Sequence, residues 1–367
     1  MERALLVTIE LDADRRGAWT LEDEQAELGE LTRSSGCEIV GEVTARRHVP
    51  VAGTFLGSGK LEEIAQAAME RQAQVAVFSQ ELSPAQQRNI EDVLRTKTID
   101  RTQLILDIFA QRARSQEGKT QVELAQLRYL MPRLIGKGVM LSRLGGGIGT
   151  RGPGEQKLEV DRRRVRARIT RLSRELEKLE ERRAATRRAR REARVPVVAL
   201  VGYTNAGKTT LLNRLTGAGS RAENRLFTTL DPLARRLRLP SGRGAVLIDT
   251  VGFLHHLPHQ LIEAFRATLE ETADADVLLH VLDASHPLAM EHAEAVSEVL
   301  AELDMKVQPR VTALNKMDCL AGQEAGARLA VSLPRAVGIS ALRGDGLPEL
   351  LTAIESCLAD SASRLAT

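Results

Sequence analysis

The chain has 367 residues, 43% of them hydrophobic, and a formal charge of +3 at pH 7, which supports packed cores in two or three domains. Its three scattered cysteines, Cys37, Cys319 and Cys357, exclude a disulfide framework and suit a reducing cytosol. No apolar run reaches bilayer length, and the apolar opening at residues 4–9 is too short for a signal peptide. We therefore expect a cytoplasmic monomer without a membrane span, for which peripheral membrane association stays open.

The first hundred residues are predicted to form a small α/β unit. Strand-like and helix-like segments alternate there, and this order favours a parallel sheet. The expected strands cover residues 4–11, 38–44 and 75–78, and the expected helices cover residues 23–34, 60–71 and 84–96.

Two long helices are predicted next, packed as an antiparallel hairpin within residues 101–194. They are joined by a loop at about residues 144–156, and seven of the ten residues from 145 to 154 are Gly or Pro. Such a loop allows close backbone approach to a partner, although a simple hinge is the alternative. The first helical stripe comprises Leu124, Leu127, Met131 and Leu134, and the second comprises Leu158, Val165, Ile169, Leu172, Leu176 and Leu179.

The second helix is strongly basic, with 16 Lys/Arg against 7 Asp/Glu in residues 157–194. Aromatic residues make up only 2% of the chain, so base stacking is poorly provided for and the phosphate backbone of folded RNA is the favoured partner. A solvated face with internal ion pairs is the alternative, disfavoured because few acidic residues lie four positions from these arginines; an acidic protein or membrane surface also stays open. The arginines assigned to RNA contact are Arg143, Arg151, Arg162, Arg163, Arg164 and Arg166.

Residues 202–209 carry the phosphate-loop pattern G-x-x-x-x-G-K-[ST]. An apolar strand is expected at residues 195–201 and a helix at 209–215, so backbone N–H groups and the helix dipole would bind phosphate. Lys208 is expected to reach the β- and γ-phosphates, and the Thr209 hydroxyl is expected to ligate Mg²⁺.

Asp249-Thr250-Val251-Gly252 follows a predicted strand at residues 245–248. Asp249 is positioned to hold the Mg²⁺ shell through water, and the Gly252 N–H is expected to bind the γ-phosphate, so that this loop senses hydrolysis. In the loop at residues 227–232, Thr229 is the preferred Mg²⁺ ligand in the GTP state, with an ordinary polar loop as the alternative.

Asn315-Lys316-Met317-Asp318 follows a predicted strand at residues 311–314. The Asp318 carboxylate can accept two hydrogen bonds from guanine, whereas adenine lacks this donor pair, so GTP or GDP is the expected ligand. The residues assigned to nucleotide binding are Gly202, Tyr203, Thr204, Asn205, Ala206, Gly207, Lys208, Thr209, Thr210, Asp249, Gly252, Asn315, Lys316, Asp318, Ser340 and Ala341.

Hydrolysis is expected to be slow without outside help. Phe253 stands where Ras-like enzymes carry the glutamine that orients the attacking water. Two interpretations of Asn205 stay open: its amide helps to hold K⁺ near the developing charge, or it hydrogen-bonds its own backbone. The catalytic roles are assigned to Lys208, Thr229, Gly252 and Asn205.

These elements predict an α/β protein with an N-terminal subdomain at residues 1–100 and a helical hairpin at 101–194. A P-loop GTPase domain with a mostly parallel sheet is expected at residues 195–361, followed by a tail at 362–367.

Further motifs resemble the HflX family of translation-associated P-loop GTPases, from about Thr54 to the end of the GTPase domain. The marks are GSGKLEEI at residues 57–64, LSPAQQRN at 82–89, IDRT at 99–102, QVELAQL at 121–127, GIGTRGPGE at 147–155, GYTNAGK at 202–208 and DTVGF at 249–253. This combination is much more specific than the GTPase motifs alone.

The resemblance implies a factor that binds the large ribosomal subunit and separates stalled or stress-inactivated ribosomes. The glycine-rich loop would reach ribosomal RNA near the peptidyl-transferase centre, and the ribosome would stimulate hydrolysis. Some family members also hydrolyse ATP and act as RNA helicases. A nucleotide-gated RNA chaperone or helicase therefore stays open, as does a protein-binding signalling GTPase.

Three departures from the family pattern stand out. Gln156 occupies a position where threonine is expected, and Thr209 one where serine is commoner. Many relatives also carry a small C-terminal domain, whereas this chain ends shortly after the GTPase fold. We therefore expect any ribosomal contact of that domain to be absent or removed.

Overall fold

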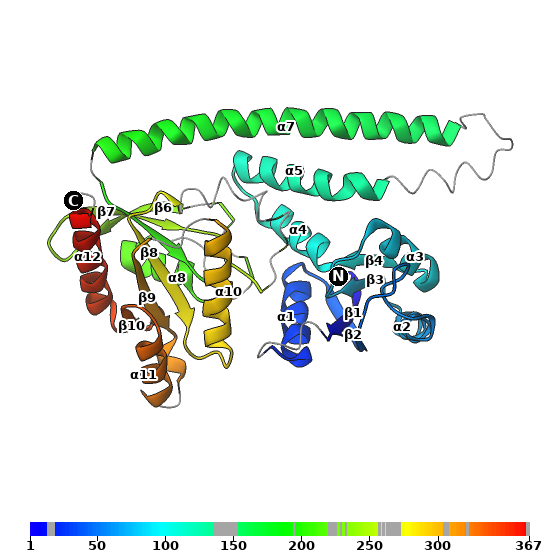
Figure 1. Cartoon of the computed structure of the whole chain (residues 1–367), viewed down its shortest axis with the longest axis horizontal. Helices are drawn as coiled ribbons and strands as arrows, with labels where there is room; N and C mark the ends of the chain where they lie inside the picture. Colours follow the sequence, from blue (N-terminus) through cyan, green and yellow to red (C-terminus); the bar gives the residue numbers. More distant parts are fainter. Residues whose placement is uncertain are drawn as a thin grey trace. The chain divides into compact units, whose positions relative to one another are not determined.

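The computed structural model describes residues 1–12, 19–134, 153–193, 195–218, 226–227, 230–231, 233–255, 258, 261, 273–303, 308–320 and 323–364. The chain divides into two compact units (Figure 1), one of Met1–Gln111 with Lys119–Lys178 and one of Arg112–Gly118 with Leu179–Thr367. The predicted α/β fold is confirmed, with two sheets that are mainly parallel. No described helix combines the length and apolar character that crossing a bilayer requires.

The first unit contains a four-stranded parallel sheet in the order β2-β1-β3-β4. The central strand β1 is buried from Ala4 to Ile9, which explains its nearly continuous apolar sequence. The elements are β1 (Arg3–Leu11), α1 (Leu21–Ser34), β2 (Glu38–Arg47), α2 (Ser58–Glu70), β3 (Val75–Phe78), α3 (Pro84–Leu94), β4 (Lys97–Asp100) and α4 (Arg101–Arg112).

Capping residues set the starts of two of these helices. Thr20 and Asp23 form a capping box that starts α1 two residues before the predicted position. Ser83 and Gln86 form the same arrangement at α3, within the LSPAQQRN motif. Strand β4 was not predicted, because its four residues are too few to show an alternating or continuous apolar pattern between two helices.

Asp100, at the end of β4, is a fully buried hub. Its carboxylate accepts hydrogen bonds from the Leu82 N–H at 3.1 Å, the Tyr129 hydroxyl at 2.7 Å and the Arg133 guanidinium at 3.2 Å. The Arg133 guanidinium also lies 3.4 Å from the centre of the Tyr129 ring. Because Tyr129 and Arg133 belong to α5 (Gln116–Arg133), this hub fixes that helix to the sheet of the first unit.

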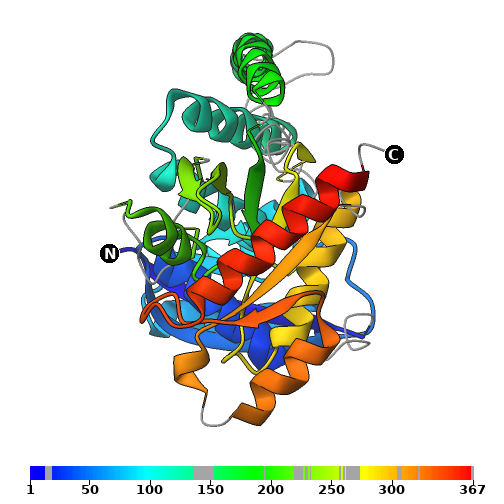
Figure 2. The same ribbon diagram turned by 90° about the vertical axis from the view of Figure 1, so that its left-hand side faces the viewer.

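Helix α7 (Pro153–Glu192) is 40 residues long and runs antiparallel beside α5 (Figures 1 and 2). Arg168 donates two hydrogen bonds of 2.7 Å to the Glu123 carboxylate on α5, and Leu172 is 1% exposed. The helix begins at Pro153, inside the loop predicted for residues 144–156, so that prediction was wrong at its C-terminal end. Proline is well tolerated in a first helical turn because its missing N–H has no partner to lose there. Residues 144–152 of this loop lie outside the described residues.

The second unit contains a six-stranded sheet in the order β10-β9-β8-β5-β7-β6, in which only β6 is antiparallel to its neighbour. Helix α12 lies across β8, β9 and β10 (Figure 2). The elements are β5 (Val197–Val201), α8 (Lys208–Thr216), β6 (Leu233–Arg238), β7 (Gly244–Asp249), β8 (Val277–Asp283), α10 (Ala289–Glu302), β9 (Arg310–Asn315), α11 (Gln323–Ser332), β10 (Ala336–Gly338) and α12 (Leu347–Arg364).

Successive residues of the central strands serve opposite faces of this sheet. Val281 packs in the same cluster as Ile354 of α12, whereas its neighbour Leu282 packs with Ala289 and Ala293 of α10. Helices therefore cover both faces, and the loops that follow the parallel strands meet at one edge, where ligands of such sheets bind.

Candidate nucleotide-binding site

The phosphate loop joins β5 to α8, which begins at Lys208. Both motif glycines are required by space. A Cβ at Gly202 would overlap the Val281 carbonyl oxygen, and a Cβ at Gly207, whose φ is +95°, would overlap the Asn315 amide. The two glycines therefore let the loop pack directly against β8 and β9, and the loop leads into the N-terminus of α8. Thr210 lies in the first turn of that helix.

The Lys208 side chain curls over this loop and is buried. Its Nζ donates hydrogen bonds to the carbonyl oxygens of Gly202 at 3.0 Å and Tyr203 at 2.8 Å. Burial lowers the pKa of Lys208 to about 8, partly opposed by the negative charge of Asp249. An anion bound at this point would favour the charged ammonium and raise this pKa again.

Thr209 and Asp249, assigned to the metal from sequence, lie within hydrogen-bond distance. The Thr209 hydroxyl donates to Asp249 Oδ2 at 2.8 Å, and Asp249 is fully buried. A hydroxyl and a carboxylate beside a phosphate loop are the oxygen ligands that Mg²⁺ prefers, so these residues fit that ion. Thr229, the third assigned ligand, lies outside the described residues.

Two backbone hydrogen bonds join the loop after β7 to the phosphate loop. The Phe253 N–H donates to the Gly202 carbonyl at 3.1 Å, and the Thr204 N–H donates to the Phe253 carbonyl at 2.8 Å. Gly252, the residue before Phe253, packs tightly against the phosphate loop. A Cβ at this position would come within 2.7 Å of Thr204 Cα and 3.1 Å of Lys208 Nζ. Gly252 is therefore next to the ammonium that is expected to bind phosphate.

The loop before β6 also contacts Thr204. The backbone N–H of Phe227 donates to Thr204 Oγ1 at 3.1 Å, and Phe227 is buried. From the sequence, Thr204 was assigned only as a member of the phosphate-loop motif. The one hint of this contact is that a hydroxyl side chain occupies a motif position where any residue is allowed.

Asn205 adopts a φ of +61°, a conformation that asparagine tolerates better than most residues. Its side chain makes no hydrogen bond within the part of the chain that the structure describes. That geometry leaves the amide available and gives no support to the interpretation in which it bonds its own backbone.

Asn315 connects the phosphate loop to the predicted base pocket. Its Nδ2 donates to the Ala206 carbonyl at 2.8 Å, and its Oδ1 accepts from the Ala341 N–H at 2.9 Å. Lys316, with a φ of +62°, forms an ion pair of 2.7 Å with Asp283. The structure therefore brings the motifs at residues 202–209, 315–318 and 340–341 together.

Asp318 faces Ser340 and Arg343. A hydrogen bond from the Ser340 side chain lowers the pKa of the Asp318 carboxyl, which burial partly opposes. Arg343 Nε lies 3.7 Å from Asp318 Oδ2. The carboxylate thus stays ionised, the form that accepts hydrogen bonds from guanine. Sequence reasoning did not identify Arg343, which follows the Ser340-Ala341 pair by two residues.

Tyr203 joins the phosphate loop to His255 and to His292, of which only His292 was not assigned from the sequence. Its ring stacks on His292 with centroids 3.8 Å apart, and its hydroxyl accepts a hydrogen bond of 2.9 Å from the His255 N–H. His286 lies against His292 at 4.3 Å. Tyr203 therefore supports the segment that follows Phe253 through the hydrogen bond to His255. Its contact with His292 could not be predicted from the sequence, because it depends on how α10 packs against β8.

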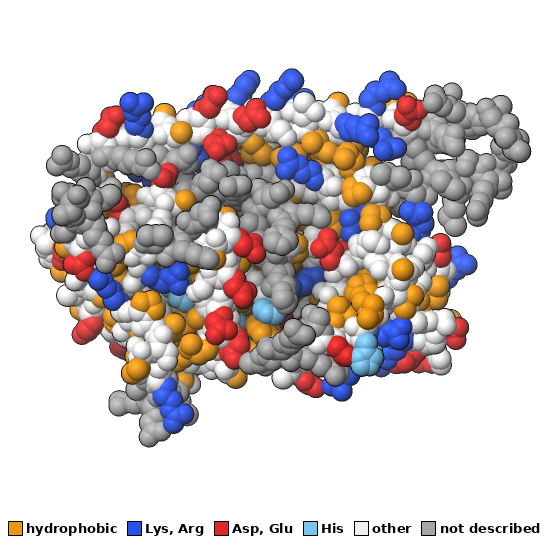
Figure 3. Space-filling view, in the orientation of Figure 1, with side chains coloured by type: hydrophobic (Ala, Val, Ile, Leu, Met, Phe, Trp, Pro, Cys, Tyr) orange, Lys and Arg blue, Asp and Glu red, His pale blue; other side chains and the backbone are white. Residues whose placement is uncertain are grey.

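The basic face of α7 is the second candidate site. Arg163, Arg164 and Arg166 are exposed, and the space-filling view shows basic side chains interspersed with acidic ones along this helix (Figure 3). Arg164 lies 3.7 Å from Asp161, three residues earlier, a pairing that a spacing of four residues does not detect. Among the residues that the structure describes, Arg163 and Arg166 form no ion pair. Arg162 is partly buried, and Arg143 and Arg151 lie outside the described residues.

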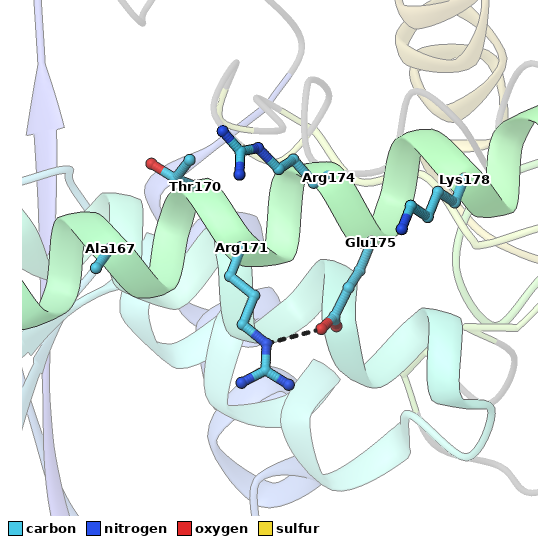
Figure 4. Close-up of a pocket in the computed structure, with 6 residues that line it drawn as sticks. All are labelled: Ala167, Thr170, Arg171, Arg174, Glu175 and Lys178. Atoms are coloured by element: carbon cyan, nitrogen blue, oxygen red, sulfur yellow. Dashed lines mark hydrogen bonds and ion pairs between the residues drawn. The ribbon is translucent and has the colours of Figure 1, made fainter.

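Further along α7, some basic side chains pair with acidic ones. Arg171 pairs with Glu175 at 3.0 Å, and Arg174 points to the other side of the helix (Figure 4). The residues of this shallow hollow are Ala167, Thr170, Arg171, Arg174, Glu175 and Lys178. Within the described residues, basic side chains without an ion pair therefore occur near the start of the helix, at Arg163 and Arg166, and also further along it, at Arg174 and Lys178.

Comparison with protein families matches three consecutive parts of the chain. Residues 22–110 match the GTP-binding GTPase N-terminal model, residues 112–190 the GTP-binding GTPase middle region and residues 197–316 the 50S ribosome-binding GTPase model.

Curated relatives cover nearly the whole chain. A protein named GTPase HflX from Caldanaerobacter subterraneus subsp. tengcongensis is 50% identical over 356 residues, which are 96% of this chain and 80% of that protein. GTPase HflX from Escherichia coli strain K12 is 46% identical over 364 residues, 99% of this chain and 84% of that protein. Among solved structures, that of an SsGBP–GDP complex aligns over 98% of this chain and 99% of that chain with a TM-score of 0.51 and 24% identity, which indicates a shared fold.

Proposed function

The chain belongs to the HflX family of GTPases, and on that premise we propose that it binds the large ribosomal subunit and separates stalled or stress-inactivated ribosomes. GTP hydrolysis is its reaction, and ribosomal RNA is the partner of its basic helix. A ribosome-bound factor of this kind works in the cytoplasm, and we propose that it acts as a monomer.

The observation that carries the proposal is the joint attachment of two loops to the phosphate loop. Phe253 is hydrogen-bonded to Gly202 and Thr204 through its backbone, and Phe227 is hydrogen-bonded to the Thr204 side chain. A nucleotide that reshapes the phosphate loop must therefore act on both loops, which is the requirement for a GTP-dependent switch.

In the proposed reaction Lys208 binds the β- and γ-phosphate oxygens, and Thr209, Asp249 and Thr229 hold Mg²⁺, Asp249 through water. The ion would neutralise the charge that develops on the transferred phosphoryl group. Gly252 would donate its N–H to the γ-phosphate, and Asn205 would help to hold K⁺ nearby. Phe253 cannot orient water, so contact with the ribosome supplies the missing stimulation.

Arg163 and Arg166 support the assignment of RNA as the partner. They are exposed, and they form no ion pair within the described part of the chain. Binding through such arginines depends on phosphate contacts, weakens with salt and needs no particular base sequence.

Co-sedimentation with purified large ribosomal subunits tests the proposal. Binding is expected with a non-hydrolysable GTP analogue and is expected to be much weaker with GDP. In a density gradient, GTP and the chain should convert assembled ribosomes into subunits, and the hydrolysis rate should rise when ribosomes are added. Equal sedimentation with both nucleotides would reject the nucleotide-dependent step.

A nucleotide-gated RNA chaperone or helicase is the second candidate, since exposed arginines on α7 suit naked RNA as well as a ribosome. It predicts strand separation on an RNA duplex without loss of assembled ribosomes. Hydrolysis of ATP in the same assay would favour it, because Asp318 discriminates against adenine only through its hydrogen bonds to guanine. Partner binding that is insensitive to salt would instead favour a protein-binding signalling GTPase.

A further inference from the structure

Asp231 connects the loop before β6 to the start of helix α5. Its Oδ2 accepts hydrogen bonds from the backbone N–H groups of Arg114 at 2.9 Å and Ser115 at 2.8 Å, and its Oδ1 accepts from the Ser115 hydroxyl at 2.5 Å. All three residues belong to the compact unit that holds the phosphate loop. Because the acceptor is a carboxylate, these bonds are stronger than neutral ones.

The same contact organises the first turn of α5. Ser115 Oγ accepts a hydrogen bond of 2.9 Å from the Gly118 N–H, so Ser115 caps the helix while Asp231 holds Ser115. A Cβ at Gly118 would overlap Asp231 Oδ1. Glycine weakens a helix, and the close approach of the Asp231 carboxylate explains its presence in this turn.

The loop that ends at Asp231 is attached to the phosphate loop at its other end. Phe227 donates its N–H to Thr204 Oγ1, and Phe227 and Leu230 are buried at 1% and 3% exposure. Four residue steps separate Phe227 from Asp231, a span of at most about 14 Å. Phe227 and Asp231 are therefore close enough along the chain for a displacement of one to move the other.

The start of α5 is in turn connected to α7. Glu117, in the first turn of α5, forms an ion pair of 2.8 Å with Arg183 of α7, and these side chains are only 16% and 18% exposed. Arg183 lies on the same continuous helix as the exposed Arg163 and Arg166. The contacts therefore run from Thr204 through Asp231 and Glu117 to the helix with the basic face.

We propose that Asp231 is the positioning residue through which the bound nucleotide sets the start of α5 and the ion pair to α7. With GTP bound, Phe227 stays on Thr204 and Asp231 stays on Ser115, and hydrolysis opens both contacts. This inference deepens the proposed function, because it names how the nucleotide would control the basic helix. Only the consequence for RNA binding rests on the proposed function.

Hydrogen–deuterium exchange of the full chain tests this inference with GDP and with a non-hydrolysable GTP analogue. The amides of Arg114, Ser115 and Gly118 are expected to exchange about tenfold more slowly with the analogue, since hydrogen bonds to a charged acceptor protect two of them directly. Gly118→Ala should abolish that difference by displacing Asp231, although alanine is the better helix former. Gly59→Ala, in the first turn of α2 where a Cβ meets nothing within 4 Å, is the matched control and should keep the difference.

Asp231→Ala removes the carboxylate directly and should match Gly118→Ala, and the double variant should lose no more than either single variant. The inference is overturned if both single variants bind nucleotide normally and keep the tenfold difference. It is also overturned if the unaltered chain binds both nucleotides and these amides exchange at equal rates. The exchange experiment contains no ribosomes, so its result does not depend on large-subunit binding. Failure of large-subunit binding would reject the proposed function without contradicting the role of Asp231.

Discussion

The side-chain oxygen of Thr204 accepts a hydrogen bond from the backbone N–H of Phe227 at 3.1 Å, while the backbone N–H of Thr204 donates to the Phe253 carbonyl at 2.8 Å. One residue of the phosphate loop thus holds the loop before β6 with its side chain and the loop after β7 with its backbone. Replacement of its side chain removes only the first attachment.

Thr204→Val keeps the shape of this side chain and removes the acceptor for the buried Phe227 N–H. We expect kcat for GTP hydrolysis to fall about tenfold with little change in KM, because an unsatisfied buried N–H costs about 1–3 kcal/mol. Thr204→Ser keeps the hydroxyl and should stay within about twofold of the unaltered chain. Steady-state kinetics would contradict the prediction if valine and serine behaved alike.

Nucleotide affinity is expected to depend on pH through Lys208. Burial lowers its pKa to about 8, and a bound phosphate favours the ammonium and so raises that pKa. The complex therefore binds more protons than the free protein above pH 8, and affinity for GDP should fall with rising pH there, by up to about tenfold per pH unit. Below about pH 7 the ammonium is already protonated and the dependence should vanish.

Isothermal titration calorimetry between about pH 7 and 9 measures this dependence. Lys208→Arg is the control, because its guanidinium keeps its charge throughout this range. The variant is expected to bind more weakly but with a flat pH profile, and an equally steep profile would assign the proton to another group.

Asp318→Ala should weaken GDP binding by about 100-fold to 1000-fold, since two hydrogen bonds to a charged acceptor are lost. Arg343→Ala is the control: its guanidinium lies 3.7 Å from Asp318 and is 62% exposed, so its loss should cost less than about threefold. Fluorescent-nucleotide titration measures both. A similar loss for the two variants would mean that Asp318 does not contact the base.

RNA binding should depend on the unpaired arginines of α7. The double variant Arg163→Ala, Arg166→Ala should reduce the slope of log affinity against log salt concentration by about 1.5 to 2. Arg171 and Arg188 are paired with Glu175 and Glu192, so replacing both with alanine should change the slope less. Filter binding to ribosomal RNA at several salt concentrations would oppose the assignment if the two pairs gave equal slopes.

The buried hub at Asp100 is expected to dominate the stability of the first unit. Asp100→Ala leaves the Arg133 guanidinium, which is 11% exposed, without its carboxylate and should cost about 3–5 kcal/mol of unfolding free energy. Asp161→Ala, which breaks an exposed pair with Arg164, should change stability by less than about 0.5 kcal/mol. Denaturant unfolding that found equal losses would remove the hub from this role.

Much of the fold could be predicted from local spacing. The parallel sheet of the first unit and the strand before the phosphate loop follow from short apolar runs, and the two long helices follow from apolar residues at helical spacing. Strand β4 was missed because it has only four residues, and the start of α7 was misplaced because Pro153 and Gly154 were taken as loop. Proline in a first turn and proline in a loop give the same local signal.

Local residue patterns were enough to predict the α/β class and the phosphate loop, because the strand, the glycines and the lysine of that loop lie close together in the chain and their spacing constrains the backbone. The contacts of Asp231 with Ser115, 116 residues away, and of Arg133 with Asp100, 33 residues away, depend instead on how the helices and strands pack. A single carboxylate carries no periodic signal of its own. Its partner is chosen by the packing of whole helices and strands, whose combined burial outweighs any one hydrogen bond.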